Sequence, residues 1–485
     1  MSSNQAGIVS GSVGFASRAL VQLLMFGVTI VATRVLTIDA FGAYALASLF
    51  LILARALFYV GPYEYLLKSK PDPQLYSACF SANLALAGLS GCVLAGCYFM
   101  APLVFETDVV GMLIALLAPS ILLVATTAWY EAMLLRSGRV RRYYLGTLIG
   151  DICGATVAVG LLLNDFGVKS LVVQTYARLF VLLLFYVLGA KDHPGFGHGI
   201  KRIAEILSWS RARYAAVLLN FTSAYGADIL LGALLSPAAT GLYRASSRIV
   251  SSLTDLFAQP LQKIAQTNLS ARFVREQDLG NSWLTMLSGV GAIAWSALLT
   301  LAYLAGDLVP FALGEKWSPA VPVVIAFCVI KSFSMLDAVT TSFLVCHDRQ
   351  HAMLGVQIGA AAAVIALALA FAPLGVTAVA IAVGAATTAM SIIYGVMAMR
   401  ISQQGAEALI SLARTSAPPV LCVAFGLALM DWFTPGLKGE TAILAGMMAA
   451  LFGFAIGSYA VRYRMLSAIG SLGHAAPGAL PGGPA

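Results

Sequence analysis

The sequence consists mainly of apolar runs about 20 residues long, the length that a helix needs to cross a bilayer. This feature leaves the chain very few possible folds. Reading the runs between charged or Pro/Gly breaks gives segments near 11–36, 42–63, 75–101, 109–132, 143–163, 170–190, 208–234, 240–264, 282–305, 320–345, 353–371, 375–399, 417–433 and 441–461. We therefore predict an all-α polytopic membrane protein with about fourteen transmembrane helices.

Composition excludes most other classes of protein. Of the 485 residues, 60% are hydrophobic and only 10% are charged, whereas soluble domains carry about 25% charged residues. A soluble enzyme and a nucleic-acid binder are therefore excluded. The net charge of +8 needs no nucleic acid to explain it, because helix insertion leaves basic residues on the cytoplasmic side. The first ten residues lack a basic stretch, so we expect the first run to be a span and not a cleaved leader.

The charges in the connections predict the topology. With both termini in the cytoplasm, the inside connections hold 19 Lys and Arg residues and the outside ones hold four, Arg34, Lys169, Lys316 and Lys438. This bias is what membrane insertion produces. The outside loops are a few residues long and offer no room for a catalytic domain. We expect a disordered cytoplasmic tail over 467–485, where Ala, Gly and Pro dominate.

A short motif occurs twice. Leu36-Thr37-Ile38-Asp39-Ala40-Phe41-Gly42-Ala43-Tyr44 is echoed by Leu235-Ser236-Pro237-Ala238-Ala239-Thr240-Gly241-Leu242-Tyr243, 199 residues later. Six segments separate the copies, so both halves insert in the same direction, as in transporters with parallel repeats. We predict two pseudo-symmetric six-helix lobes, an N-terminal one over 1–205 and a C-terminal one over 206–400. Two additional helices follow over 401–466.

A polar stripe runs along the segment near 240–264. It consists of Arg244, Arg248, Ser251, Asp255, Gln259, Gln262 and Gln266. At helical spacing these residues fall within an arc of about 80° and cover about 33 Å of helix. Such a stripe cannot face lipid. It either lines a hydrated cleft or forms a self-paired Arg–Asp ladder that only joins helices.

Three other segments have polar faces that the repeat places beside this one. They contain Arg18, Gln22, Thr29 and Thr33; Arg55 with Ser48 and Tyr59; and Asn220 with Asp228. If these faces converge, the arginines outnumber the two aspartates and leave the cleft electropositive. The planar guanidinium suits phosphate oxygens. We therefore expect an anionic, phosphate-bearing substrate, with Arg18, Arg55, Arg244, Arg248, Asn220, Gln22 and Gln259 as candidate substrate-binding residues.

Further ionisable residues lie within the apolar segments. Together with Asp228 and Asp255, Glu131, Lys331 and Asp337 are candidates for coupling or charge pairing. Each carboxylate could bind a coupling proton or Na⁺, or pair with a neighbouring Arg or Lys. We expect no cofactor and no metal site, because the seven cysteines include no CxxC pair and the His347/His351 pair lacks a third ligand.

Several motifs carry a family resemblance. Thr33-Arg34-Val35-Leu36 followed by Phe41-Gly42-x-Tyr44 resembles the end of helix 1 and the start of helix 2 in polysaccharide (Wzx-type) flippases. The stretch from Asp228 to Tyr243, and Leu313-Gly314-Glu315-Lys316-Trp317-Ser318-Pro319-Ala320, resemble their helix 7–8 and 9–10 connections. The likeness spans roughly residues 10 to 400. It identifies the multidrug, oligosaccharidyl-lipid and polysaccharide exporter superfamily.

The resemblance implies a function. Wzx-type flippases move undecaprenyl-diphosphate-linked oligosaccharide across the bacterial inner membrane by alternating access, for exopolysaccharide, capsule or O-antigen synthesis. Polysaccharide polymerase and co-polymerase are the partners that it implies. Arg18, Arg55 and Arg244 or Arg248 occupy helices where related lipid II flippases also place essential arginines. The sequence departs from the family pattern at Gly61-Pro62-Tyr63-Glu64, where an apolar stretch is common.

Two alternatives remain at this point. A cation-coupled multidrug exporter of the same superfamily would have a cleft dominated by carboxylates and aromatic residues, which fits this chain less well. A membrane glycan polymerase or ligase would need a large outside loop, which is missing from the predicted topology. We therefore expect a transporter and not an enzyme.

Overall fold

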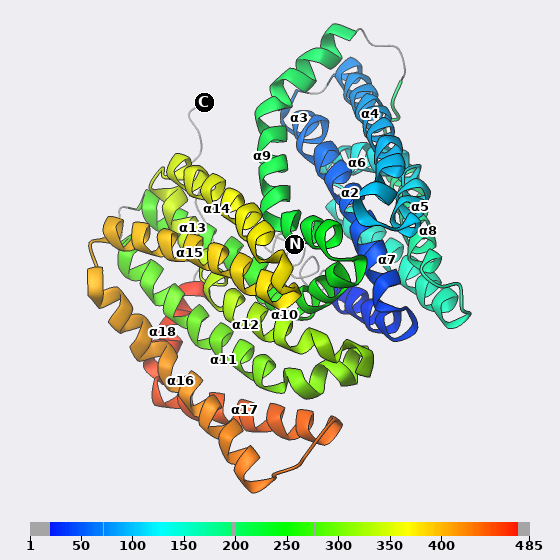
Figure 1. The fold of residues 1–485 in the computed structure, drawn as a ribbon. Coiled ribbons are helices and arrows are strands. Elements are labelled where there is room, and N and C mark those ends of the chain that lie inside the picture. Colours follow the sequence, from blue (N-terminus) through cyan, green and yellow to red (C-terminus); the bar gives the residue numbers. More distant parts are fainter. Residues whose placement is uncertain (1–19, 71, 196–199, 276–277, 474–485) are drawn as a thin grey trace. The chain divides into compact units, whose positions relative to one another are not determined.

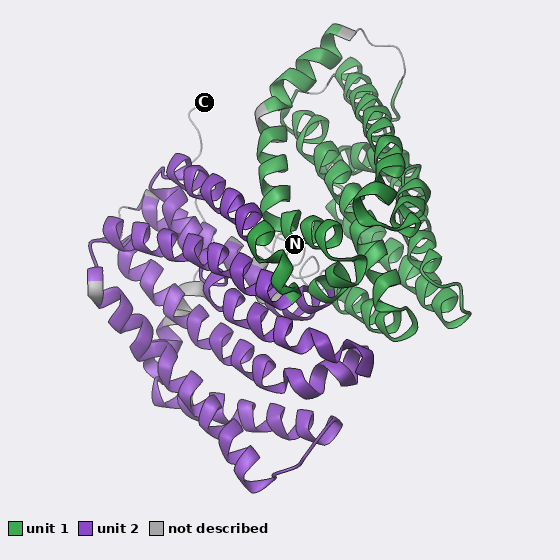
Figure 2. Ribbon diagram, viewed as in Figure 1, with its two compact units in different colours: residues 1, 5–244, 368–376 green, residues 2–4, 245–367, 377–485 purple. Residues whose placement is uncertain are grey.

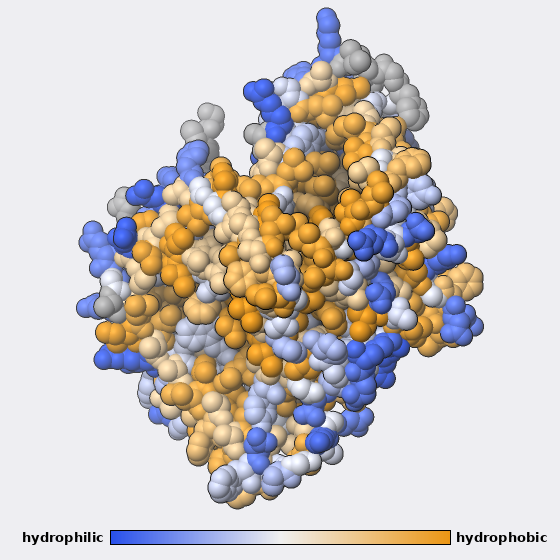
Figure 3. Space-filling view, in the orientation of Figure 1, coloured by the Kyte–Doolittle hydropathy of each residue, from blue (hydrophilic) through white to orange (hydrophobic). Residues whose placement is uncertain are grey.

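A computed structural model describes residues 20–70, 72–195, 200–275 and 278–473 of the chain. Every regular element within these ranges is a helix (Figure 1). Large apolar side chains such as Phe99, Leu103 and Phe452 lie exposed on the helices, and apolar residues cover much of the face seen in Figure 3. Exposed side chains of this kind are expected where helices meet lipid. The predicted all-helical membrane protein is confirmed.

The helices form two compact units, coloured separately in Figure 2. Unit 1 comprises residues 5–244 and 368–376, within the described ranges. Its first helix is Leu20–Val35. The others are α2 (Ile38–Val60), α3 (Pro62–Lys68), α4 (Pro73–Phe105), α5 (Asp108–Leu117), α6 (Ser120–Arg136), α7 (Val140–Leu163), α8 (Lys169–Gly189), α9 (Ile200–Leu234) and the short η2 (Ala372–Leu374). Its largest core cluster joins α2, α4, α5 and α6 around Leu46, Leu113 and Ile121.

Unit 2 comprises residues 245–367 and 377–485, again within the described ranges. The helix α10 (Pro237–Val274) begins in unit 1 and continues into unit 2. The others are α11 (Leu279–Leu313), η1 (Glu315–Ala320), α12 (Val321–Ser334), α13 (Asp337–Cys346), α14 (Gln350–Phe371), α15 (Val376–Ser402), α16 (Gly405–Phe433), α17 (Glu440–Ala460) and α18 (Arg462–Gly473). The buried α11 packs against α12, α16 and α17.

The predicted segments coincide with helices, but only twelve helical stretches in the described residues are both long and apolar enough to cross a membrane. The two other segments correspond to the helix Leu20–Val35, which is shorter, and to α10, whose polar stripe lowers its hydropathy. The count of fourteen and the orientation of the termini therefore stay predictions.

The lobes that we inferred from the repeat also stay a prediction. The boundary between the compact units falls within α10, after Arg244, whereas the repeat places it at residue 205. The reason is that α9 packs against α2, α3 and α4 of unit 1. The boundary between the compact units, after Arg244, thus differs from the boundary at residue 205 that the repeated motif predicts.

Prolines break some helices and not others. The second segment breaks at Gly61, between α2 and α3, and the fourth breaks before Ser120. At Gly61 a Cβ atom would lie 2.0 Å from the Tyr214 hydroxyl of α9, so a larger residue there would force the tyrosine side chain to shift. By contrast, α10 continues through Pro260.

The two copies of the repeated motif form the same local structure. Thr37 accepts a hydrogen bond from the Ala40 amide at 3.2 Å, and Ser236 accepts one from the Ala239 amide at 3.2 Å. Both are N-caps, which satisfy a free amide in the first turn of α2 and of α10. The motif therefore encodes a capped helix start.

The two starts also contact each other within unit 1. A Cβ atom on Gly42 would lie 1.8 Å from the Pro237 carbonyl oxygen, and one on Gly241 would lie 2.8 Å from the Ile38 carbonyl oxygen. Real Cβ atoms do not come this close to backbone atoms. Both copies of the motif therefore contain glycine at this position because a side chain there would clash with the backbone of the other copy.

The C-terminal segment differs from the expected tail. The helix α18 runs to Gly473 and so includes the first residues of the region 467–485 that we expected to be disordered. The strong bias toward Ala, Gly and Pro begins only after His474, and the stretch before it contains good helix formers such as Met465 and Leu466. Residues 474–485 lie outside the described ranges.

Candidate functional site

The predicted polar stripe lies on one continuous helix. Within α10, Arg244, Arg248, Ser251 and Asp255 are half-buried, and Gln262 and Gln266 are exposed. The side chain of Gln259 lies outside the described part of the chain. None of the described stripe residues is fully buried, whereas Ala245, Ile249 and Val250 on the other faces are. The stripe is therefore an accessible polar surface along a helix that is long enough to span a membrane.

The first stripe residue forms an ion pair. The Arg244 Nε atom lies 3.2 Å from the Oδ1 atom of Asp228, and its guanidinium lies over the Tyr225 ring at 4.6 Å from the centroid. Asp228 is only 1% exposed. Neither of its carboxylate oxygens has a hydrogen-bond partner among the described residues. The arginine is thus the group that balances this buried charge.

This pair joins α9 to α10 and is backed by a second contact. The Thr240 hydroxyl donates a hydrogen bond of 2.9 Å to the Asp228 main-chain carbonyl. The self-paired arrangement that we considered from the sequence thus describes Arg244. Its side chain nevertheless keeps 23% of its surface exposed, so one edge of the guanidinium stays accessible.

A second buried carboxylate is held without an ion pair. Glu131 of α6 accepts hydrogen bonds from the hydroxyls of Tyr59 at 2.7 Å and Tyr63 at 3.1 Å. It is 6% exposed. Arg55 lies over the Tyr59 ring at 5.2 Å from its centroid. Arg55 and Arg178 act electrostatically on Glu131, but no described Lys or Arg comes within ion-pair distance of it.

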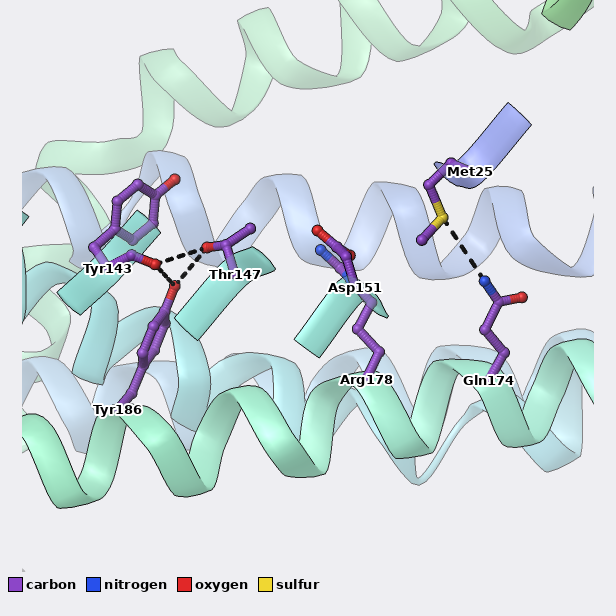
Figure 4. Close-up of polar contacts among 7 residues, drawn as sticks. All are labelled: Met25, Tyr143, Thr147, Asp151, Gln174, Arg178 and Tyr186. Carbon is purple, nitrogen blue, oxygen red and sulfur yellow. Dashed lines mark hydrogen bonds and ion pairs between the residues drawn. The ribbon is translucent and has the colours of Figure 1, made fainter. Parts of the chain in front are cut away.

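A third buried carboxylate belongs to the seam between α7 and α8. Asp151 forms an ion pair with the Nε atom of Arg178, and polar contacts continue along the same two helices (Figure 4). On one side, Thr147 and the Tyr186 hydroxyl are 2.9 Å apart. On the other side, the Gln174 amide of α8 donates to the Met25 sulfur of a third helix, Leu20–Val35, at 3.7 Å. The seam is therefore polar along much of its length, although it lies inside apolar helices.

The remaining predicted residues are dispersed. Arg18 lies outside the described residues. Gln22 is half-buried on the helix Leu20–Val35, while Arg55 and Asn220 are exposed. In the same helix, the Thr29 and Thr33 hydroxyls donate to main-chain carbonyls one turn earlier, so they are already satisfied.

Unit 2 contributes one further carboxylate contact. The Ser391 hydroxyl of α15 donates a hydrogen bond of 2.7 Å to Asp337, at the start of α13. Lys331 and Asp337 form no ion pair with each other within the described ranges, although we considered such pairing. No group of three or more potential metal ligands occurs among the described residues.

Sequence reasoning missed two features of unit 1. It named Glu131 but not its donors. The spacing of Tyr59 and Tyr63 by four residues was only a partial signal, because the helix breaks between them at Gly61. It also did not pair Asp151 with Arg178, two charged residues within apolar segments. Nothing in one sequence fixes which helices are neighbours, so that pairing could not be predicted.

The fold resembles that of solved membrane transporters. The fold matches a solved structure of the lipid II flippase MurJ in an inward closed conformation, with a TM-score of 0.75 over 95% of this chain and 100% of that chain, at 15% identity. It also matches an inward-facing multidrug resistance transporter of the MATE family, with a TM-score of 0.61 over 79% of this chain and 94% of that chain, at 13% identity. At these identities the likeness concerns the fold. The chain thus has a fold that solved membrane transporters also adopt.

The chain belongs to the family described as polysaccharide biosynthesis protein, whose family model matches residues 31–322. It is also similar to the lipopolysaccharide biosynthesis protein WzxC of Escherichia coli (strain K12), at 27% identity over 153 residues. That match spans 30% of this chain and 30% of WzxC. The predicted membership of the polysaccharide exporters is thereby confirmed.

Proposed function

We propose that this protein is a flippase that moves undecaprenyl-diphosphate-linked oligosaccharide repeat units across the bacterial inner membrane. The exported units would serve exopolysaccharide, capsule or O-antigen synthesis. The observation that carries the proposal is the stripe on α10, because a polar surface that protein does not bury must meet water or a polar ligand. Family membership and the fold shared with a lipid II flippase support the same conclusion.

The arginines suit such a cargo. A diphosphate is costly to carry through the apolar core of a bilayer, as any charge there is. Arg244, Arg248 and Arg55 have accessible side chains, and guanidinium groups bind phosphate oxygens through paired hydrogen bonds. The glycan headgroup would follow the polar stripe, while the polyprenyl tail stays in lipid. Alternating access then moves only the polar part of the molecule.

Coupling to a proton or Na⁺ belongs to the proposal as well. Glu131 is the strongest candidate, since it is buried, accepts two tyrosine hydroxyls and has no described ion-pair partner. Asp228, Asp255 and Asp337 are further candidates. Both termini would lie in the cytoplasm, in line with the distribution of basic residues. A polysaccharide polymerase and co-polymerase would accept the product at the outer face.

A multidrug exporter is the second candidate, because the fold also matches a multidrug transporter. The two functions differ in their cargo. A lipid-linked glycan that accumulates at the cytoplasmic face after deletion of the gene supports the flippase. Unchanged glycan export, together with new sensitivity to cationic drugs, would support the exporter.

Charge reversal tests the role of the arginines. We expect Arg248→Glu to abolish polysaccharide export while the protein still reaches the membrane in normal amounts. Arg248 is preferable to Arg244 for this test, because reversal at Arg244 also breaks the pair with Asp228. The matched control is Lys438→Glu, at an exposed connection between α16 and α17. Normal export by the Arg248 variant would contradict the proposal.

A further inference from the structure

One face of α9 lies against the short helix α3 at one end of unit 1. Arg202, Ile206, Trp209 and Arg213 recur at the spacing of a single helix face. Ile206 is buried, and Arg202 forms an ion pair with Asp72 at 3.2 Å. Trp209 and Arg213 continue the face toward the apolar part of the helix. Trp209 and Arg213 therefore lie on the face of α9 that packs against α3.

Trp209 lies among cationic and aromatic groups from both helices. The Lys68 ammonium is 3.8 Å from the centroid of the indole, and the Arg213 guanidinium is 5.2 Å from it. The Tyr65 ring meets the indole edge-on at a centroid distance of 5.2 Å. Cation–π contacts of this kind hold a positive charge in place without neutralising it.

The cluster is open and contains a lysine that forms no ion pair with a described carboxylate. Lys68 is exposed, and no described carboxylate pairs with it. The Arg213 side chain is 50% exposed and forms an ion pair with Glu64, whose side chain is 34% exposed. Arg213 and Glu64 offset each other, and Glu205 of α9 hydrogen-bonds to Tyr65. Lys68 is therefore the cation of the cluster that has no described ion-pair partner. The neighbouring Leu67 exposes 39% of its surface beside Lys68.

The cluster lies where apolar helix gives way to polar chain. The helix α9 has 35 residues, or about 52 Å at the helical rise, which exceeds the roughly 30 Å of bilayer hydrocarbon. Its apolar stretch begins at Arg213, and α3 ends at Lys68. Tryptophan beside basic residues at this level is typical of groups that contact lipid headgroups.

We propose that Lys68, Trp209 and Arg213 form a binding site for the phosphodiester headgroup of an anionic phospholipid. Lys68 and Arg213 would hold the phosphate, and the indole and Leu67 would contact the glycerol and the upper acyl chain. A phosphodiester carries one negative charge, which the ammonium of Lys68 can pair with. Occupation would strengthen the joint between α3 and α9, since the lipid contacts both helices.

Binding of short-chain lipids to the purified full-length protein tests this site. Native mass spectrometry would count bound dioctanoyl phosphatidylglycerol and, in parallel, dioctanoyl phosphatidylcholine, which has no net charge. We expect saturable binding of phosphatidylglycerol that is at least tenfold tighter than binding of phosphatidylcholine and weaker at high salt. Lys68→Gln combined with Arg213→Gln should weaken phosphatidylglycerol binding about tenfold, and Trp209→Leu should also weaken it. Lys438→Gln is the matched control and should bind as the unaltered protein does.

Three results would overturn the proposal. The first is equal affinity for the two phospholipids. The second is undiminished binding by the double variant in a protein that elutes as one folded species. The third is tighter binding of farnesyl diphosphate at the same residues. The last result would make the cluster a site for the lipid-diphosphate cargo. The proposal does not depend on the proposed function, because phospholipid binding is measured without any transport.

Discussion

Asp228 and Glu131 are two buried carboxylates of the same unit, and their charges are handled in opposite ways. Asp228 faces an arginine at 3.2 Å and has no described hydrogen-bond donor to its carboxylate. Glu131 accepts hydrogen bonds from two tyrosine hydroxyls and has no described ion-pair partner. Their exposed fractions are similarly small, at 1% and 6%. Burial therefore does not explain the difference.

The difference suggests two roles. A buried ion pair is worth little against an apolar contact, but removal of one partner leaves a charge stranded at high cost. Asp228 and Arg244 are therefore suited to hold α9 and α10 in register until an anionic ligand competes for the arginine. Tyrosine hydroxyls can hydrogen-bond a carboxylate without supplying a balancing charge. Glu131 is the carboxylate better suited to take up and release a cation.

The largest effect is expected when Asp228 loses its partner. Arg244→Gln should cost about 3–5 kcal/mol of stability, because it leaves an uncompensated buried charge. The thermal unfolding midpoint of the purified protein measures this loss. Adding Asp228→Asn to the same chain removes the stranded charge and should restore most of the lost stability. If the double variant is no more stable than the single one, Asp228 is not the charge that Arg244 balances.

A smaller effect is expected at the tyrosines. Tyr59→Phe should cost about 1.5–3 kcal/mol, the usual range for a hydrogen bond to a charged group. Tyr63→Phe should cost less than Tyr59→Phe, since its hydrogen bond is longer, 3.1 Å against 2.7 Å. Unfolding midpoints of the two variants, compared under the same conditions, give the order. The reverse order would show that the shorter contact is not the stronger one.

The smallest effect on stability is expected from Glu131→Gln. The amide oxygen can still accept from one tyrosine hydroxyl, and the amide NH₂ can donate to the other. The charge is removed while both contacts are kept, so stability should change by about 1 kcal/mol or less. Transport in reconstituted vesicles should lose its dependence on the proton or Na⁺ gradient. Asp337→Asn, in unit 2, tests that further candidate in the same assay. Transport by Glu131→Gln that still follows the gradient would exclude Glu131 from coupling.

The sequence was sufficient for most of the fold and for part of the site. Continuous apolar runs predicted where the helices lie, because a helix in lipid must satisfy its own backbone. Helical periodicity placed Arg55 and Tyr59 on one face, and the two are stacked. The contacts of Glu131 with Tyr59 and Tyr63, and of Asp151 with Arg178, depend on which helices are neighbours, and that information is not local. Whether a proline breaks a helix is also not local, since α10 continues through Pro260 whereas the second segment breaks beside Pro62.

The close approach of Gly42 to the Pro237 carbonyl has a consequence for how the chain can be divided. The start of α2 is completed by a piece of chain almost 200 residues away. A fragment that ends at residue 205 would therefore lack the backbone surface on which α2 sits. Halves produced separately should recover their structure only when both are present, and a side chain added to either glycine should prevent their reassembly.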